Sequence, residues 1–202
     1  MGLTGAATLP RFGTDGWRAT IADEYTFDNV RLVTQAIADF AKANWRHERG
    51  IVVGFDTRFG SDRFAKTVCE VLAANGIRSL ISCDPIPTPA CAYSVSQESA
   101  AGGIIVTASH NPPSDNGIKV RDNTGAAVPP GELEKIEAAI EGRAGSEVAS
   151  MPYSEARVVG LVKEFDPKPG YLKGLRSAVD VDRLSEAAYP IVIDSMWGSG
   201  AG

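Results

Sequence analysis

Residues 102–112 read Gly-Gly-Ile-Ile-Val-Thr-Ala-Ser-His-Asn-Pro. The stretch Gly102–Thr107 is a short apolar run, which is typical of a buried parallel strand. Because this run continues directly towards Ser109, we expect the serine hydroxyl at the carboxyl end of the strand. Open α/β sheets bind their ligands at this edge. The stretch therefore predicts both the kind of fold and the place of a functional site within it.

Strand and helix signals alternate on both sides of this stretch. Thr26 can cap a helix because its hydroxyl can accept a backbone N–H of the first turn, and Asn75-Gly76 is a helix stop signal. The predicted elements are strands at 51–56, 77–83 and 117–121, helices at 27–41, 61–74 and 131–141, and a short helix that starts at Thr88-Pro89. This alternation predicts an α/β fold with three α/β/α layers and a mixed, mostly parallel sheet.

The carboxyl-terminal part of the chain is less regular. Residues 142–162 have weak patterning and predict a loop, and residues 171–179 predict a connecting helix. Residues 189–194 predict a strand that leads into a glycine-rich turn, and because no helix follows that turn we expect the chain to stop inside a second domain. The predicted division is 1–165 for domain I with the reactive serine, 166–188 for a connecting helix and linker, and 189–202 for the truncated start of domain II.

Composition excludes several classes of function. The 202 residues carry a net charge of −5, whereas nucleic-acid binders usually show a basic excess. No apolar stretch is long enough to cross a membrane, and Met1–Pro10 lacks the basic and apolar regions of a secretory signal. The three cysteines lack CxxC spacing and predict buried free thiols rather than a zinc site. We therefore expect a cytoplasmic protein with neither a nucleic-acid nor a membrane partner.

Ser109 is a candidate carrier of a phosphoryl group. A phosphoserine has a charge of about −1.5 to −2 and three acceptor oxygens, so it needs cations and donors nearby. Arg18, His110 and Lys119 are candidate partners, and Asn111 supplies a hydrogen-bonding side chain. The alternative is that Ser-His-Asn-Pro only forms a turn, and spacing alone favours neither. The motif lacks the glycines of a hydrolase G-x-S-x-G elbow.

Three motifs together carry a family resemblance: Phe12–Arg18 (FGTDGWR), Thr107–Pro112 (TASHNP) and Asn116–Lys119 (NGIK). They resemble those of the α-D-phosphohexomutases, which include phosphoglucomutase, phosphomannomutase and phosphoglucosamine mutase. The resemblance covers about residues 11–141 and resumes near 189. It implies an isomerase that interconverts hexose 1-phosphate and hexose 6-phosphate by intramolecular phosphoryl transfer. Phosphorylated Ser109 would donate its group to the sugar, form a bisphosphate intermediate and recover the other phosphate.

The resemblance also implies roles for individual residues. Ser109, His110 and Lys119 would be catalytic, with His110 hydrogen bonding and Lys119 a general acid or base. Arg18 and Asn111 would line the phosphate and substrate site. Mg²⁺ would bind an oxygen of the phosphate on Ser109, and a glucose 1,6-bisphosphate-type activator would prime the enzyme. Among hexose phosphates, glucose phosphate is the first choice and mannose phosphate the second.

The family has four domains, of which the first three share an α/β/α architecture. Its metal loop, Asp-Gly-Asp-x-Asp-Arg, does not occur in these 202 residues. We therefore expect domains II–IV of a parent protein as partners and no activity from this chain alone. The alternative is a non-catalytic module that binds a phosphosugar. Two further residues are interpreted structurally, Arg58 as a member of an ion pair and Asp15 as an organiser of its loop.

Overall fold

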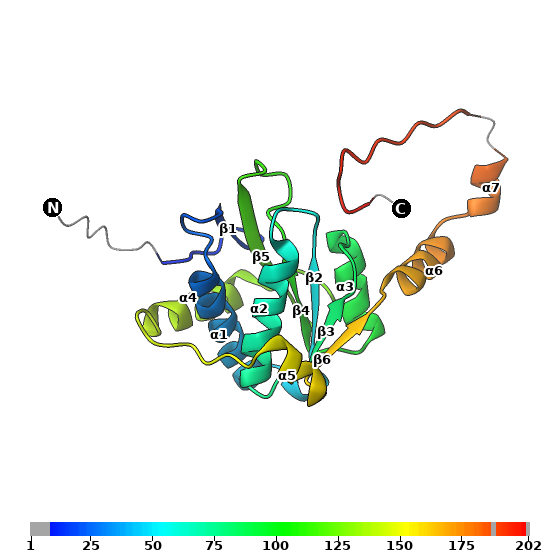
Figure 1. Ribbon diagram of the computed structural model, residues 1–202. Coiled ribbons are helices and arrows are strands. Elements are labelled where there is room, and N and C mark those ends of the chain that lie inside the picture. Colours follow the sequence, from blue (N-terminus) through cyan, green and yellow to red (C-terminus); the bar gives the residue numbers. More distant parts are fainter. Residues whose placement is uncertain (1–8, 187–188, 201–202) are drawn as a thin grey trace.

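A computed structural model describes residues 9–186 and 189–200, which form a six-stranded sheet with helices on both faces (Figure 1). The strand order is β1-β5-β4-β2-β3-β6. The strands are β1 (Trp17–Thr20), β2 (Ile51–Phe55), β3 (Ser79–Ser82), β4 (Gly102–Val106), β5 (Asp115–Arg121) and β6 (Val162–Phe165). Strands β4, β2, β3 and β6 are parallel to one another, whereas β5 is antiparallel to both β4 and β1. The predicted mixed, mostly parallel sheet is confirmed.

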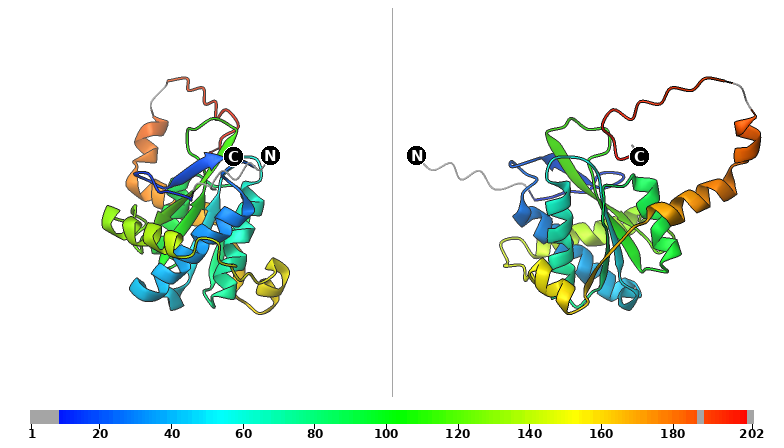
Figure 2. Two further views of the ribbon diagram at one scale, coloured as in Figure 1. Left: turned by 90° about the vertical axis from the view of Figure 1, so that its left-hand side faces the viewer. Right: turned by 45° about the vertical axis from the view of Figure 1, so that its right-hand side comes forward.

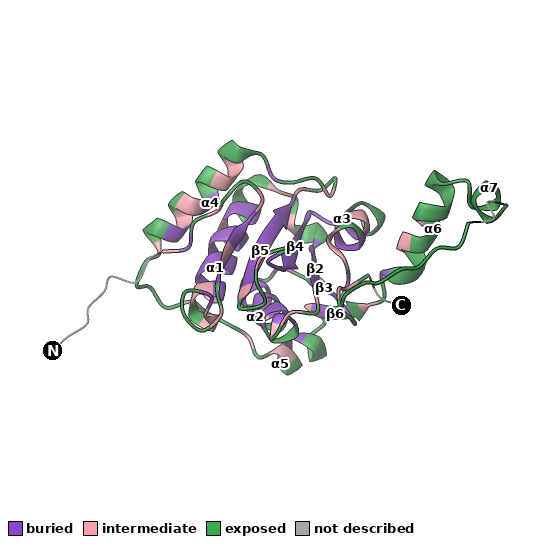
Figure 3. Cartoon of the chain, turned by 90° about the horizontal axis from the view of Figure 1, so that it is seen from above, coloured by how far each residue is buried: buried purple, intermediate pink, exposed green. Residues whose placement is uncertain are grey.

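The helices complete the three predicted layers. They are α1 (Phe27–Asn44), α2 (Ser61–Ala74), α3 (Thr88–Gln97), α4 (Pro130–Gly142), α5 (Tyr153–Val158), α6 (Lys168–Ala178) and α7 (Val181–Ser185), with a 3-10 turn at His47–Arg49. Helices α1, α2 and α4 lie on one face of the sheet and α3 lies on the other (Figure 1). The larger part of the core fills the space between the sheet and α1, α2 and α4. Figure 3 shows this buried centre, with α6 and α7 exposed beyond it.

Local sequence explains where the main helices begin and end. Thr26 caps α1 as predicted, because its Oγ1 accepts the N–H of Asn29 at 3.2 Å. Asp28 then places a negative charge in the first turn, where the helix dipole favours it. Helix α2 is followed by Gly76, whose φ of +71° suits glycine better than any other residue.

The order of the strands creates a switch point at the carboxyl edge of the sheet. The chain leaves β2 through α2 on one face to reach β3, then crosses through α3 on the other face to reach β4 on the far side of β2. The connections that follow β2 and β4 therefore diverge, and α/β sheets bind ligands in the crevice left at such a point. We call residues 107–114, which connect β4 to β5, the serine loop.

The carboxyl-terminal region departs from the prediction. Within the predicted loop 142–162 the chain forms α5 and begins β6, a short edge strand whose residues are mostly exposed and so lack an apolar run. Residues 189–194 form no strand and are exposed, because in the described chain no sheet edge lies beside them to pair with. Helix α6 matches the predicted connecting helix. The division into domains stays a prediction, and positions 1–8, 187–188 and 201–202 lie outside the described residues.

Two further expectations concern the cysteines and the membrane. Cys69 and Cys91 are buried free thiols as predicted, but Cys83 is exposed because it lies just beyond the carboxyl end of β3. Among the described residues, no helix combines the length and the apolar character that a membrane span requires.

Candidate active site

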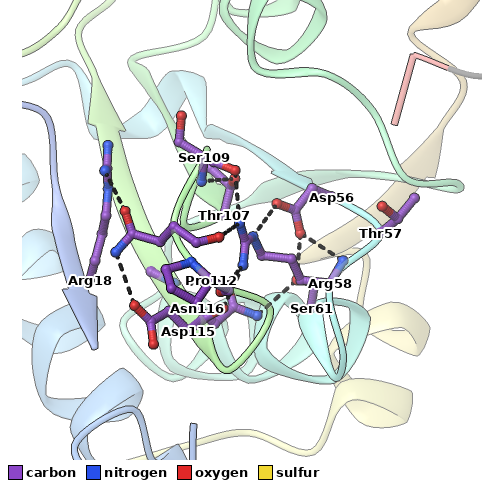
Figure 4. Close-up of polar contacts among 12 residues, drawn as sticks. Arg18, Asp56, Thr57, Arg58, Ser61, Thr107, Ser109, Pro112, Asp115 and Asn116 are labelled. Atoms are coloured by element: carbon purple, nitrogen blue, oxygen red, sulfur yellow. Dashed lines mark hydrogen bonds and ion pairs between the residues drawn. The ribbon is translucent and has the colours of Figure 1, made fainter. Parts of the chain in front are cut away.

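Ser109 lies in the serine loop at the carboxyl edge of the sheet, where the sequence places it (Figure 4). Its φ is +58°, in the left-handed region that residues other than glycine rarely adopt. The N–H of Ser109 donates to Thr107 Oγ1 at 2.9 Å, and the N–H of Asn111 donates to the carbonyl of Ala108 at 3.1 Å. The residue itself is exposed, so the hydroxyl is accessible to a substrate.

A pocket of about 680 Å³ opens beside Ser109. The serine loop contributes Ser109, His110 and Asn111 to its wall, which brings three of the predicted residues together. The opposite wall comes from the connection after β2, the start of α3 and residues 196–199. This last segment follows the exposed helices α6 and α7 (Figure 2) and is held where Thr57 Oγ1 donates to the carbonyl of Trp197 at 2.8 Å.

Arg58 contacts the serine loop from the connection between β2 and α2. Its guanidinium donates four hydrogen bonds of 2.7–3.0 Å, to the carbonyl oxygens of Ser109, Asn111, Pro112 and Asp115. The predicted ion pair is present as well, because Nε lies 3.4 Å from Asp56 Oδ2. The sequence indicated the ion pair but not the four hydrogen bonds to carbonyl oxygens. Every residue has a backbone carbonyl, so the sequence does not show which of them accept a hydrogen bond.

Arg18 reaches the serine loop from β1, at the edge of the sheet. Its Nη1 donates to Asn111 Oδ1 at 2.9 Å, and Asn111 Nδ2 in turn donates to Asp115 Oδ2 at 3.0 Å. The hydrogen bond from Asn111 is the main reason why the pKa of Asp115 is lowered. Arg18 is therefore joined to the loop through Asn111 and does not line the pocket beside Ser109.

Lys119 lies apart from this pocket. It sits in β5 opposite Ile105, four residues before Ser109, and its side chain is turned to Asp15 rather than to the serine. Asp15 binds Lys119 Nζ at 2.5 Å through one carboxylate oxygen and Arg121 Nη1 at 2.7 Å through the other. Lys119 and Arg121 are only 5% and 7% exposed. Asp15 thus positions two side chains of β5 in addition to organising its own loop. The acid or base role of Lys119 stays a prediction.

The ionised form of Asp15 should stabilise the fold. Burial acts to raise its pKa, but hydrogen bonds from Arg121 and Lys119 outweigh burial and hold the pKa below the usual 3.8. Asp15→Asn would leave two nearly buried cations without their carboxylate, and we expect it to lower the free energy of unfolding by about 2 kcal/mol, reduced from the fully buried case because Asp15 is partly exposed. Urea unfolding at pH 7 measures the difference.

The same measurement has a defined pH dependence and a control. Because the pKa is lower in the folded state, the stabilisation is complete above the unfolded pKa of about 3.9 and is lost as the pH falls through the folded value. The gap between the two proteins should therefore close in acid. Asp28→Asn, which removes an exposed partner of Arg31, should change stability by no more than about 0.5 kcal/mol. Equal effects of the two substitutions would contradict this account.

The described residues do not supply a complete magnesium site. Mg²⁺ prefers about six oxygen ligands in octahedral geometry. Among the described residues, no group of three or more His, Cys, Asp or Glu side chains could hold a metal ion. Asp56, the carboxylate that follows β2, is already engaged by Arg58 and by Ser61 Oγ at 2.8 Å. We therefore derive no chemical step from a metal.

The chain is similar to known phosphosugar mutases. Residues 10–146 match the family model described as phosphoglucomutase/phosphomannomutase, alpha/beta/alpha domain I. A phosphoglucosamine mutase of Synechococcus sp. (strain CC9902) is 33% identical over 98% of this chain and 40% of its own length. A probable phosphomannomutase of Haemophilus influenzae is 36% identical over 65% of this chain and 28% of its own length.

Solved structures show the same likeness. A candidate phosphomannomutase from Thermus thermophilus superposes with a TM-score of 0.76 at 32% identity, over 88% of this chain and 38% of that structure. The open form of Paramecium parafusin, at 22% identity and a TM-score of 0.76, shares the fold over 95% of this chain and 40% of that structure. The chain thus spans about 40% or less of the length of the relatives it resembles.

Proposed function

Because the chain belongs to the phosphoglucomutase/phosphomannomutase family through its alpha/beta/alpha domain I, we propose that Ser109 carries a phosphoryl group and exchanges it with a hexose monophosphate. The observation that supports this most directly is the presentation of Ser109. An exposed serine is held in a left-handed conformation at the carboxyl edge of the sheet, with its loop carbonyls bound by Arg58 and a pocket of about 680 Å³ beside it. A turn without function does not need an exposed serine, bound loop carbonyls and a pocket at the same edge of the sheet.

The proposed reaction moves one phosphoryl group in each half. The bond between phosphorus and Ser109 Oγ breaks as a bond to a sugar hydroxyl oxygen forms, and the hydroxyl proton is released. In the return half, the phosphate at the other end of the sugar bisphosphate transfers to Ser109 Oγ, and a proton returns to the oxygen that it leaves. Phosphoryl transfer depends chiefly on alignment and neutralisation of charge. Asn111, held by Arg18, would align the substrate, and His110 would hydrogen bond to it. Lys119 would move the proton, which requires its side chain to turn from Asp15 towards the pocket.

Further parts of the proposal concern the substrate and the cofactor. Glucose and mannose phosphates remain candidates, and the names of similar proteins add glucosamine phosphate. Mg²⁺ would bind the phosphate on Ser109 and draw its other ligands from residues outside the described chain, and a hexose 1,6-bisphosphate would restore the phosphoserine. The remaining domains of a longer protein would complete the site. The free thiols of Cys69, Cys83 and Cys91 suit a cytoplasmic location.

The test uses the protein translated from the entire reading frame that encodes these residues. After exposure to Mg²⁺ and glucose 1,6-bisphosphate, intact-mass spectrometry should show an addition of roughly 80 Da, and peptide mapping should place it on Ser109. The loaded protein should then convert hexose 1-phosphates to 6-phosphates in a panel of glucose, mannose and glucosamine substrates. Binding of these sugars without loading or conversion would instead favour the non-catalytic phosphosugar-binding module.

A further inference from the structure

Four of the five N–H donors of the Arg58 side chain bind backbone carbonyl oxygens. A guanidinium has five N–H donors in one plane. Four of them reach the carbonyl oxygens of residues 109, 111, 112 and 115, and the fifth, on Nε, faces Asp56 Oδ2 at 3.4 Å. The side chain is only 13% exposed. All four N–H donors on the two terminal nitrogens are therefore occupied, and Arg58 cannot offer them to a phosphate unless it first releases the backbone carbonyls.

These contacts control the conformation of Ser109. A residue with φ near +58° stays in that conformation only when its surroundings hold it there. Thr107 Oγ1 accepts the N–H of Ser109, while Arg58 Nη2 binds the carbonyl of the same residue at 2.8 Å. The two peptide groups that flank the Ser109 side chain are thus each fixed by a hydrogen bond. Together they set the direction of the Cα–Cβ bond that carries Oγ.

Arg58 is itself tied to two strands through Asp56 and Ser61 (Figure 4). Asp56, directly after β2, accepts the backbone N–H of Arg58 at 3.0 Å and the hydroxyl of Ser61 at 2.8 Å. Asn116 of β5 donates to that hydroxyl at 2.9 Å, and its own Oδ1 accepts the N–H of Gly117. This chain of hydrogen bonds ties the position of Arg58 to β5, the strand into which the serine loop runs.

We propose that Arg58 is a positioning residue that holds Ser109 in the geometry in which Oγ faces the pocket, and that it makes no contact with the transferred phosphoryl group. Its consequence for catalysis rests on the proposed function, whereas its effect on the loop does not. Lysine cannot replace it, because three donors on a single nitrogen cannot span four separate carbonyls. The role therefore requires the planar guanidinium and not merely a positive charge.

The test compares Arg58→Ala and Arg58→Lys with Arg63→Ala in the 202-residue chain. Arg63 is a matched control because it lies in α2 with its guanidinium 5.4 Å from the ring centre of Phe27, away from the serine loop. NMR would measure hydrogen exchange at the amides of Ser109, Asn111 and Asp115, which all donate within the loop. We expect exchange at least about tenfold faster in Arg58→Ala, an intermediate increase in Arg58→Lys and no change in Arg63→Ala.

A chemical rescue separates positioning from general destabilisation. Added guanidinium ion should slow the loop exchange of Arg58→Ala again, whereas methylammonium, with the same charge and no fork of donors, should not. In the protein from the entire reading frame, Arg58→Ala should lower kcat at least about tenfold with little change in KM, and guanidinium should restore part of kcat. Unchanged loop exchange in Arg58→Ala would overturn the proposal, and if that variant does not fold, unchanged exchange in Arg58→Lys would do so.

The outcomes distinguish this proposal from the proposed function. A loop that loosens in Arg58→Ala, in a protein that never loads a phosphoryl group, supports the positioning role and contradicts the proposed function. Phosphoryl transfer in a protein whose loop exchange is unchanged by Arg58→Ala supports the proposed function and contradicts the positioning role.

Discussion

Ser109→Ala is expected to reduce hexose phosphate isomerisation at least about a thousandfold and to abolish the mass increase of the loaded protein, because the substitution removes the only atom proposed to accept the phosphoryl group. The fold should remain intact. Ser109 is exposed, and its loop contacts run through its backbone N–H and carbonyl rather than through Oγ. Stability should therefore stay within about 0.5 kcal/mol of the original. Coupled assays and urea unfolding of the protein from the entire reading frame measure the two quantities.

Ser114→Ala provides the matched control. Ser114 is another exposed serine of the same loop, and its hydroxyl donates to Asp115 Oδ1 at 3.1 Å. We expect it to keep most of the isomerisation rate and all of the loading. Activity retained by Ser109→Ala, or loading mapped to a different residue in the original protein, would remove Ser109 from the proposed mechanism.

Gly117→Ala should destabilise the fold more than Asp15→Asn does. A Cβ at this position would lie 2.5 Å from the carbonyl oxygen of Trp17 and 2.7 Å from that of Thr107. Both are backbone atoms of the sheet and its loop, so they cannot move aside as a flexible side chain could. The substitution should lower the free energy of unfolding by about 3 kcal/mol, the upper end for overpacking. For a chain of this size, that corresponds to a fall of about 6–12 °C in melting temperature.

Gly131→Ala tests whether the loss comes from the crowded position. Gly131 lies in α4, and apart from its chain neighbours and the backbone of its own helix nothing lies within 4 Å of the place where its Cβ would be. Because alanine favours helices more than glycine does, this variant should be as stable as the original or up to about 1 kcal/mol more stable. A melting temperature for Gly117→Ala equal to that of Gly131→Ala would show that β1 and the serine loop can separate at no cost.

The apolar runs of the sequence were sufficient to predict most of the sheet. Strands β2, β3 and β4 are buried and lie within the predicted ranges, and the return strand predicted at 117–121 lies within β5. Strand β6 escaped prediction because an edge strand needs few apolar residues when one of its faces is exposed. The prediction of a strand at 189–194 was wrong. These residues form an apolar run, but among the described residues no neighbouring strand pairs with them and buries their side chains.

The sequence was sufficient to predict the candidate site residues that lie in one local motif. It did not predict the contacts that hold these residues in place. The segment after a buried strand identified Ser109, His110 and Asn111, which share one pocket. Arg58 and Asp15 were recognised as structural, but not as the residues that hold the serine loop and Lys119. These contacts join positions 51 and 104 residues apart, and no local pattern encodes a distance of that kind.

The pairing of β1 with β5 delays the completion of this part of the sheet during synthesis of the chain. Arg18 can make its hydrogen bond to the serine loop only after Asn111, 93 residues later in the chain, has been synthesised. At about 5–20 residues per second, a ribosome needs about 5–20 seconds to synthesise that interval. During this time β1 has been synthesised, but β5, the strand with which it pairs, has not. Until β5 is made, Trp17 lacks Ile118, the residue opposite it in the sheet, so this apolar side chain cannot reach the buried position that it has in the folded protein.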